Sequence, residues 1–376
     1  MEDLILIALM LVIAKTAGYL FERAKQPTVL GQILAGILIG LYFKSDEVIH
    51  AFSNMGVLLL LFLAGLESDI NEFKRVGKPS MLIATIGVIV SFIMGFLIAL
   101  PFFSIRNALL MGAIMTPTSV SITVRVLMEL RKLRAREGVA ILAAAVIDDV
   151  LGILVLTIVI SILKEGNVNL LSILEIIVEV AGFLFLLLKF GVPLMDKIFH
   201  QVSRIKLPES TPAFALVIAI SFAILAERMN IASILGAYMT GLVIGQTYYG
   251  KQVMDKLSTL GYTLFIPIFF VEVGMSIDIS YVYHAGLFAV LYTMTAIASK
   301  VLGCGLGAYL GGFNLQESIK VGVGMIPRMG VELAMLAIAI KSGVADDDIL
   351  TIAVFMVFVT TIITPPLLKW VYTKLE

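Results

Sequence analysis

Long runs of apolar residues dominate the chain, separated by short segments that carry charges, prolines or clusters of asparagine and glycine. A helix that spans a lipid bilayer needs about 20 consecutive apolar residues. A transmembrane β-barrel would instead alternate in polarity over segments of about ten residues. The runs predict thirteen transmembrane helices, at roughly 4–22, 27–43, 53–67, 80–101, 106–129, 137–163, 170–199, 211–227, 231–247, 258–274, 284–311, 316–341 and 348–373.

Composition supports an all-α integral membrane protein. Of the 376 residues 60% are hydrophobic and only 14% are charged, whereas soluble domains are about 45–50% apolar and about 25% charged. Lys and Arg together number 27 and so do Asp and Glu, so lipid rather than nucleic acid is the expected partner. One cysteine, Cys304, and three scattered histidines argue against a disulfide framework, a resident metal site or any other cofactor.

The distribution of basic residues predicts the orientation in the membrane. Most Lys and Arg residues fall in one alternate set of loops, and basic loops stay in the cytoplasm. This rule places the N-terminus outside and the C-terminus inside a plasma membrane. The acidic start Met1–Asp3 differs from the basic start of a signal peptide, so we expect the first apolar run to be retained. The sequence contains no long polar segment, so we expect no soluble regulatory domain in this chain.

The chain resembles itself at an offset of about 205–210 residues. The matches, in constant order, are Leu30-Gly31, Gly36 and Gly40 with Leu235-Gly236, Gly241 and Gly245; Gly65 and Asp69 with Gly274 and Asp278; and Pro117 with Pro327. They predict two repeats, about 4–163 and 211–373, linked by helix 170–199. An odd number of helices separates equivalent positions, so the repeats would be inverted in the membrane. Inverted repeats are typical of secondary transporters.

Pro117 and Pro327 interrupt apolar spans at corresponding positions of the two repeats. A proline removes one helical hydrogen bond and clashes with the preceding turn, and in lipid the freed groups must find partners in protein or water. One such proline could be a simple kink, but the matched pair favours paired discontinuous helices that cross near the bilayer midplane. Polar side chains flank both breaks: Thr118 and Ser119 beside the first, Arg328 and Glu332 beside the second.

Three ionisable residues lie in the middle of apolar spans. Asp148 and Asp149 are adjacent in AAAVIDDVLGILVL, and Lys300 is central in the run 284–311. A charge at a helix centre in the bilayer costs about 2.5–3.5 kcal/mol or more, so such residues mark transport pathways. A structural polar pair and a snorkelling lysine are the alternatives, but Lys300 is too deep for easy snorkelling. We therefore predict an ion site at the two aspartates, with Lys300 as a counter-ion. Near a span end, Arg125 and Glu129 have the i, i+4 spacing of a helical ion pair.

These segments resemble the cation–proton antiporter superfamily in its NapA/KefC-like branch. The matching elements are FLAGLESD (62–69), TPTSVSITVRVL (116–127), AAAVIDDVLG (143–152), Lys300 and GMIPRMGVELAML (324–336). The resemblance covers essentially the whole membrane chain, without the nucleotide-binding regulatory domain of the KefC-like proteins. The Asp-Asp pair with a membrane lysine is its most specific part.

The resemblance implies a fold and a mechanism. It implies a homodimer, with dimerisation elements at about 4–43 and 211–247 and a mobile core at about 80–163 and 284–373. Members with an Asp-Asp pair are typically electrogenic sodium–proton antiporters that use alternating access. Residue by residue, it implies sodium or lithium binding at Asp149, support from Asp148, Thr118 and Ser119, a Lys300–Asp148 pair, and an acidic position at Glu332.

Three other functions stay open. A potassium–proton antiporter could use the same fold, because the Asp-Asp pair only favours sodium or lithium. An intramembrane aspartyl protease would need two carboxylates that converge from different helices on a water, and Lys300 would have no role in it. An organic anion symporter shares inverted repeats but needs no lysine paired with an acidic site. We therefore expect a transporter, and no enzyme.

Overall fold

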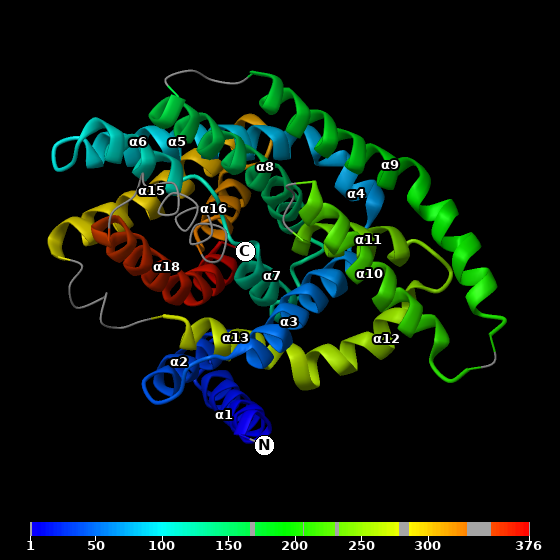
Figure 1. Ribbon diagram of the computed structural model, residues 1–376. Coiled ribbons are helices and arrows are strands. Elements are labelled where there is room, and N and C mark those ends of the chain that lie inside the picture. Colours follow the sequence, from blue (N-terminus) through cyan, green and yellow to red (C-terminus); the bar gives the residue numbers. More distant parts are fainter. Residues whose placement is uncertain are drawn as a thin grey trace. The chain divides into compact units, whose positions relative to one another are not determined.

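The computed structural model describes residues 2–165, 170–205, 207–229, 233–277, 286–328 and 347–375, and helices are the only regular elements within these ranges (Figure 1). Nine of the helices found there are long and apolar enough to cross a membrane. Three shorter apolar helices are Thr28–Gly40, Ile105–Ile114 and Ser233–Gly245. An all-helical membrane protein is therefore confirmed, whereas the count of thirteen spans stays a prediction.

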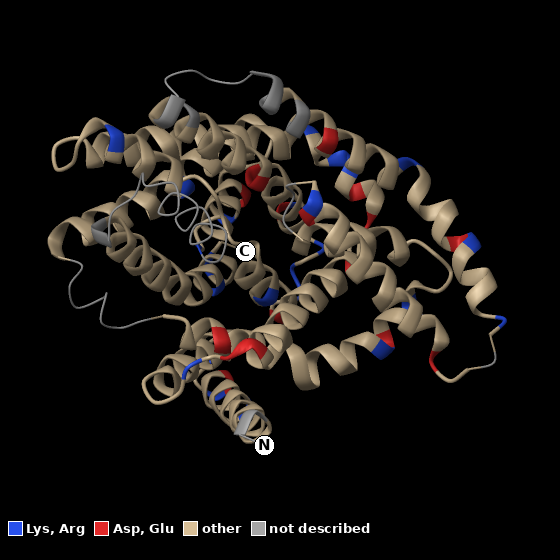
Figure 2. Ribbon diagram, viewed as in Figure 1, with Lys and Arg blue, Asp and Glu red and all other residues tan. Residues whose placement is uncertain are grey.

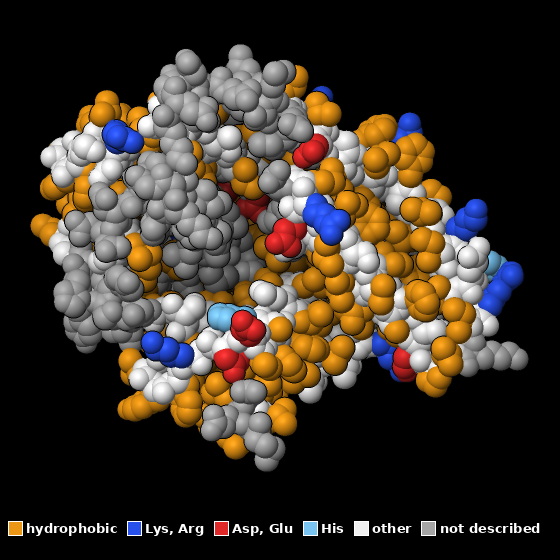
Figure 3. Space-filling model, viewed as in Figure 1, with side chains coloured by type: hydrophobic (Ala, Val, Ile, Leu, Met, Phe, Trp, Pro, Cys, Tyr) orange, Lys and Arg blue, Asp and Glu red, His pale blue; other side chains and the backbone are white. Residues whose placement is uncertain are grey.

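The surface has the character expected of a protein that faces lipid. Figure 2 shows that long stretches of many helices carry no charged residue, and Figure 3 shows hydrophobic side chains over much of the visible face. On α9 (Leu170–Val202), Phe185, Leu186, Phe190 and Leu194 are all exposed. Contiguous exposed apolar patches of this kind are rare on soluble monomers and mark contact with a membrane or a partner.

The chain divides into two compact units. Unit 1 comprises Met1–Lys74, Leu127–Arg134 and Ile176–Ser276, and unit 2 comprises Arg75–Val126, Ala135–Glu175 and Ile277–Glu376. The ranges expected for dimerisation fall in unit 1. The ranges expected for the mobile core fall in unit 2, except for residues 127–134. The roles of the two units in dimerisation and movement stay predictions.

Unit 1 is built mainly from the N-terminal and central helices. They are α1 (Glu2–Arg23), α2 (Thr28–Gly40), α3 (Glu47–Glu67), most of α4 (Ile70–Arg75), most of α9, α10 (Ser210–Arg228), α11 (Ser233–Gly245), α12 (Gly250–Leu260), the π-helical turn η1 (Gly261–Phe265) and α13 (Ile266–Met275). The helix α3 begins six residues before its expected start at residue 53, because Asp46 caps it by accepting a hydrogen bond from Ile49 N at 2.8 Å.

Four glycines hold two helix crossings together inside unit 1. Gly36 on α2 faces Gly274 on α13, and Gly65 on α3 faces Gly241 on α11. A Cβ atom on any of the four would lie 2.0–2.2 Å from a carbonyl oxygen of the facing helix, so only glycine permits this approach. The sequence matches pair Gly36 with Gly241 and Gly65 with Gly274. The two crossings are thus reciprocal, as a two-fold relation between repeats would require, although the repeat itself stays a prediction.

Unit 2 contains the helices that carry the mid-span charges. They are α5 (Gly77–Ala99), α6 (Ile105–Ile114), most of α7 (Val120–Glu129), α8 (Arg136–Glu165), α15 (Gly286–Leu310), α16 (Leu315–Gly324) and α18 (Asp347–Lys374). The helix α15 packs against α5, α16 and α18. Its contact with α5 is close, because Ser91 Oγ and Ser299 Oγ lie 3.1 Å apart and Gly87 lies directly against Cys304.

The structure changes two of the expected spans and describes only part of a third. The span 106–129 is two helices, α6 and α7, as the proline break requires. The span 258–274 is the end of a longer run of helix from 250 to 275, whose polar first part, α12, escaped a search for apolar runs. The short polar helix α4 escaped it for the same reason. Of the span 316–341, the part after Arg328 lies outside the described residues.

Candidate ion site

Both proline breaks begin where the sequence places them. The helix α6 ends at Ile114 and α7 begins at Val120, so a non-helical segment, 115–119, contains Pro117. The helix α16 ends at Gly324, and the non-helical residues that follow lead through Pro327. The first discontinuity is confirmed. The helix expected after the second break lies outside the described residues.

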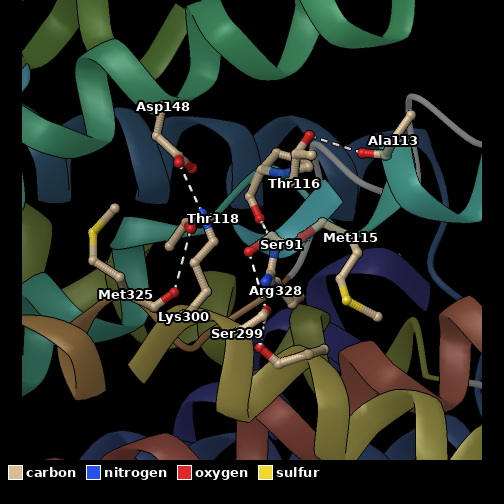
Figure 4. A network of polar contacts seen from close by, with 12 residues as sticks. Ser91, Ala113, Met115, Thr116, Thr118, Asp148, Ser299, Lys300, Met325 and Arg328 are labelled. Atoms are coloured by element: carbon tan, nitrogen blue, oxygen red, sulfur yellow. Dashed lines mark hydrogen bonds and ion pairs between the residues drawn. The ribbon is translucent and has the colours of Figure 1, made fainter. Parts of the chain in front are cut away.

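The two breaks contact each other within unit 2 and satisfy each other's backbone groups (Figure 4). Ser119 N donates a hydrogen bond to Pro327 O at 2.8 Å. Thr118 Oγ1 donates to Met325 O at 3.3 Å, and Thr123 Oγ1 donates to Gly324 O at 2.6 Å. These bonds meet the requirement that non-helical backbone at membrane depth finds its partners in protein.

Arg328 neutralises the end of α6 at the first break. Its side chain is fully buried, and Nη1 donates a 2.7 Å hydrogen bond to Met115 O and another to Pro117 O. The last carbonyl groups of a helix carry partial negative charge, so the guanidinium group compensates them where the helix is interrupted. Thr361 Oγ1 of α18 donates to Arg328 O at 3.1 Å and holds the backbone of the second break.

Lys300 and Asp148 form the expected ion pair. Lys300 Nζ on α15 lies 2.8 Å from Asp148 Oδ1 on α8, and both side chains are 0% exposed. The contact is visible in Figure 4. The other oxygen, Asp148 Oδ2, is buried and has no hydrogen-bond partner within the described residues. A buried carboxylate oxygen without a donor is costly, which makes it a natural point of attachment for a cation or a proton.

Asp149 follows directly on α8 and is also buried. One turn later on the same helix, a Cβ atom on Gly152 would lie 3.3 Å from Pro117 Cβ and 3.7 Å from Thr116 Oγ1. Residues three and four apart share a helix face, so the face of α8 that carries the aspartates packs on the first break. Lys300 Nζ pairs with Asp148, and Arg328 Nη1 donates to carbonyl oxygens of the first break.

Nearly all of the predicted residues meet in one region of unit 2. Pro117, Thr118, Ser119, Pro327 and Arg328 form the two contacting breaks, while Asp148 and Lys300 form the ion pair beside them. Glu332 lies outside the described residues. No group of three or more His, Cys, Asp or Glu residues able to hold a metal occurs among the residues described.

Two polar residues of this region were not predicted. Thr123 lies four residues after Ser119, so helical spacing from the first break could have found it. Thr361 gives no such signal, because threonine is common within apolar spans and its contact with Arg328 O joins residues 33 positions apart. The roles of all these residues in ion binding stay predictions.

Comparison with known proteins places the whole chain in one family. The family model described as sodium/hydrogen exchanger, transmembrane, matches residues 8–374. The chain is 37% identical over 372 residues to the Na(+)/H(+)-K(+) antiporter GerN of Bacillus cereus, covering 97% of this chain and 95% of GerN. It is 34% identical over 386 residues to a Na(+)/H(+) antiporter of Enterococcus hirae, covering 100% of this chain and 99% of the relative.

The fold is shared with a solved antiporter. The sodium proton antiporter MjNhaP1 from Methanocaldococcus jannaschii, determined at pH 8, superposes with a TM-score of 0.71 and 20% sequence identity. The match covers 100% of this chain and 99% of that one. At this identity the likeness establishes the architecture alone, and together with the apolar helices it identifies a multi-pass membrane protein.

Proposed function

This chain belongs to the sodium/hydrogen exchanger family, and on that premise we propose that it exchanges sodium or lithium ions for protons across the plasma membrane. The observation that carries the proposal is the fully buried Lys300–Asp148 ion pair, with Asp149 beside it and two helix breaks in contact nearby. Ionisable residues at this depth in a membrane protein mark ion pathways by default.

We propose that the cation binds at Asp149 and Asp148. Hard cations prefer oxygen ligands, and the buried Asp148 Oδ2 offers one without displacing Lys300. Hydroxyl groups of Thr118 and Ser119 and carbonyl groups at the break are further candidate ligands on the same face. Arg328 would not bind the cation. Its role would be to keep the segment around Pro117 in its non-helical conformation, through its hydrogen bonds to Met115 O and Pro117 O.

Exchange follows if protons and sodium compete for the same carboxyl groups. The loaded site would move between the two faces of the membrane, and an empty site that keeps its carboxyl groups ionised would face a large desolvation cost in crossing. This cost would couple the two fluxes. If Lys300 releases its proton when Asp148 binds sodium through Oδ2, two protons exchange for one cation, and transport is electrogenic.

The decisive experiment is sodium-driven proton flux in proteoliposomes, followed with a pH-sensitive dye. Asp149→Asn should abolish the flux, whereas Asp255→Asn, which alters an exposed carboxylate on α12, should leave it intact. Sodium-driven flux retained by Asp149→Asn would remove the central assignment. A second measurement under a clamped membrane potential tests the stoichiometry, because a rate indifferent to voltage contradicts electrogenic exchange.

Potassium is the alternative cation. The relative GerN is named a Na(+)/H(+)-K(+) antiporter, which favours testing both sodium and potassium on this chain. Replacing sodium by lithium or potassium in the same vesicles distinguishes a sodium–proton antiporter from a potassium–proton antiporter. Sodium- and lithium-driven flux without potassium-driven flux supports the primary proposal, and the reverse order of rates replaces it.

We further propose a homodimer formed through about 4–43 and 211–247, with an external N-terminus and a cytoplasmic C-terminus. Cys304 is buried against Gly87, so a Cys304→Ser background would allow single cysteines to be placed at either end. Labelling of a cysteine near the N-terminus by an impermeant reagent in whole cells supports the orientation. Labelling of the C-terminal position instead would reverse it. Light scattering in detergent would give the mass of the assembly.

A further inference from the structure

The start of α2 is capped by a carboxylate from a distant part of the chain. Thr28, the first residue of α2, donates its backbone N–H to Glu129 Oε2 at 3.0 Å and its hydroxyl to Glu129 Oε1. The residue before it is Pro27, which provides no side-chain cap, and the first turn of α2 contains no acidic residue. Glu129 therefore supplies both the hydrogen-bond acceptor and the negative charge that a helix start favours.

Glu129 is the last residue of α7, and the chain turns sharply after it. Arg131 N donates to Met128 O at 3.1 Å and Lys132 N donates to Leu127 O at 2.8 Å. This closure puts Arg131 in the left-handed region, at φ 56°, where glycine is usual at a helix end. A non-glycine residue in this conformation indicates that the surrounding contacts fix the turn.

A second set of contacts holds the same helix end. Tyr262 OH donates to Met128 Sδ at 3.6 Å from the π-helical turn η1. Lys15 Nζ on α1 donates to Tyr262 O at 2.7 Å. Single π-helical turns are rare and often occur at functional positions. All of these residues belong to unit 1, so the segment 127–134 is anchored there by α1, α2 and η1.

The helix α7 therefore has its two ends in different surroundings. Its first residue, Val120, follows the break at Pro117 in unit 2, and its last three residues belong to unit 1. The next helix, α8, starts at Arg136 in unit 2 and carries Asp148 and Asp149. A helix of ten residues is about 15 Å long, so Glu129 is too far along α7 to be a ligand at the break.

We propose that Glu129, through its cap on Thr28, is a positioning residue: a pivot that fixes the end of α7 while the ion site at its other end changes access. The inference rests on the proposed antiport and deepens it. The pivot stays closed throughout the transport cycle, because both carboxylate oxygens, the sharp turn at Arg131 and the Tyr262 contact hold it. Loosening it slows the exchange of access between the two faces but leaves the ion ligands in place.

Flux and sodium binding in the same variants test the pivot. Glu129→Ala should lower the maximal rate of sodium-driven proton flux about tenfold, and Glu129→Gln, which keeps one acceptor, about threefold, as expected for hinge residues. The apparent KM for sodium and the rise in melting temperature on adding sodium should stay within about twofold of the wild type. Arg134→Ala is the matched control, because this side chain on the same segment is 73% exposed and reaches Glu67 only at 4.0 Å.

The outcomes separate the pivot from the proposed function. Wild-type protein without sodium-driven flux refutes the antiport itself. An active wild type with an unchanged maximal rate in Glu129→Ala refutes the pivot alone. Loss of the sodium-induced stabilisation in Glu129→Ala would also overturn it, because Glu129 would then belong to the ion site.

A cross-link provides a test if Glu129→Ala does not fold. In the Cys304→Ser background, Thr28→Cys and Glu129→Cys would be joined by a short bifunctional thiol reagent. A fixed pivot predicts that the joined protein exchanges at least half as fast as the same double variant before reaction. A block of flux on joining would show that the contact must open in each cycle and would overturn the proposal.

Discussion

Two buried carboxyl groups on α8 each pair with a lysine from another helix, and the two pairs differ in distance, exposure and position along α8. Lys300 Nζ lies 2.8 Å from Asp148 Oδ1 in the middle of the helix, and both side chains are 0% exposed. Lys320 Nζ lies 3.8 Å from Glu137 Oε1 in its first turn, and each side chain is 10% exposed. The first pair is short and fully buried, and the second is longer and partly exposed to solvent.

The surroundings of the two pairs explain why only one suggests transport. Glu137 lies at a helix start, where partial positive charge favours a carboxylate, and Lys320 also lies over the ring of Tyr372 at 4.9 Å. Asp148 receives no help from a helix end, and a second acid, Asp149, follows it. Burial of a charge pair alone therefore does not identify an ion site. What sets the mid-span pair apart is the second buried carboxyl group, Asp149, which follows Asp148 on the same helix.

The sharpest test of this comparison is transport itself. Asp148→Asn should lower sodium-driven proton flux by about 100-fold or more, because it removes a proposed ligand and the partner of Lys300. Glu137→Gln should keep the flux within about twofold of the wild type. Proteoliposome assays of both variants check the prediction, and equal losses in the two would erase the distinction between the pairs.

The second-largest expected difference between the two pairs is in their contribution to stability. Removing one partner of a fully buried ion pair costs about 3–5 kcal/mol, so Lys300→Met should lower the free energy of unfolding by an amount near this range. Lys320→Met should cost about 1 kcal/mol, because the pair is longer and partly solvated. Chemical unfolding in detergent measures both. A larger loss at Lys320 would mean that the Lys320–Glu137 pair is the main structural one.

Double variants sharpen the same contrast. Adding Asp148→Asn to Lys300→Met should recover about 2–3 kcal/mol, because the second change removes the orphaned buried charge. Adding Glu137→Gln to Lys320→Met should recover less than about 1 kcal/mol. The two double-mutant cycles are compared in one detergent, and additive losses at the mid-span pair would contradict the ion pair.

The smallest effect concerns the aromatic ring beside the Lys320–Glu137 pair. Tyr372→Leu should cost about 0.5–1 kcal/mol of unfolding free energy through the lost cation–π contact with Lys320. Tyr309→Leu, at an exposed position of α15, is the matched control. Thermal unfolding of the two variants should resolve the difference, and identical transitions would show that the ring of Tyr372 contributes nothing measurable.

The sequence predicted the features that depend on hydrophobicity along the chain. Apolar runs located most spans, and Pro117 located the break between α6 and α7. The mid-span position of Lys300 pointed to the aspartates because few other partners exist at that depth. The polar helices α4 and α12 were missed, because apolar runs do not reveal a helix made largely of polar residues.

Contacts between distant residues set the limit of such reasoning. Helical spacing offered Arg125 as the partner of Glu129, but the carboxylate also caps Thr28, 101 residues away. The bonds from Arg328 to Met115 O and Pro117 O involve backbone carbonyl groups, which have no sequence signature. The π-helical turn at Tyr262 arises from an extra residue in one helical turn, and local propensity does not reveal it.

The glycine crossings of unit 1 have a consequence for leakage. Where Gly36 meets Gly274 and Gly65 meets Gly241, two helix backbones touch without side chains between them. Helix backbones in such close contact leave little room between them for a chain of water molecules that could conduct protons. A protein that couples two ion gradients depends on a low leak of ions as much as on its binding site. A methyl group added at one of these glycines would separate the helices, and we expect it to increase that leak.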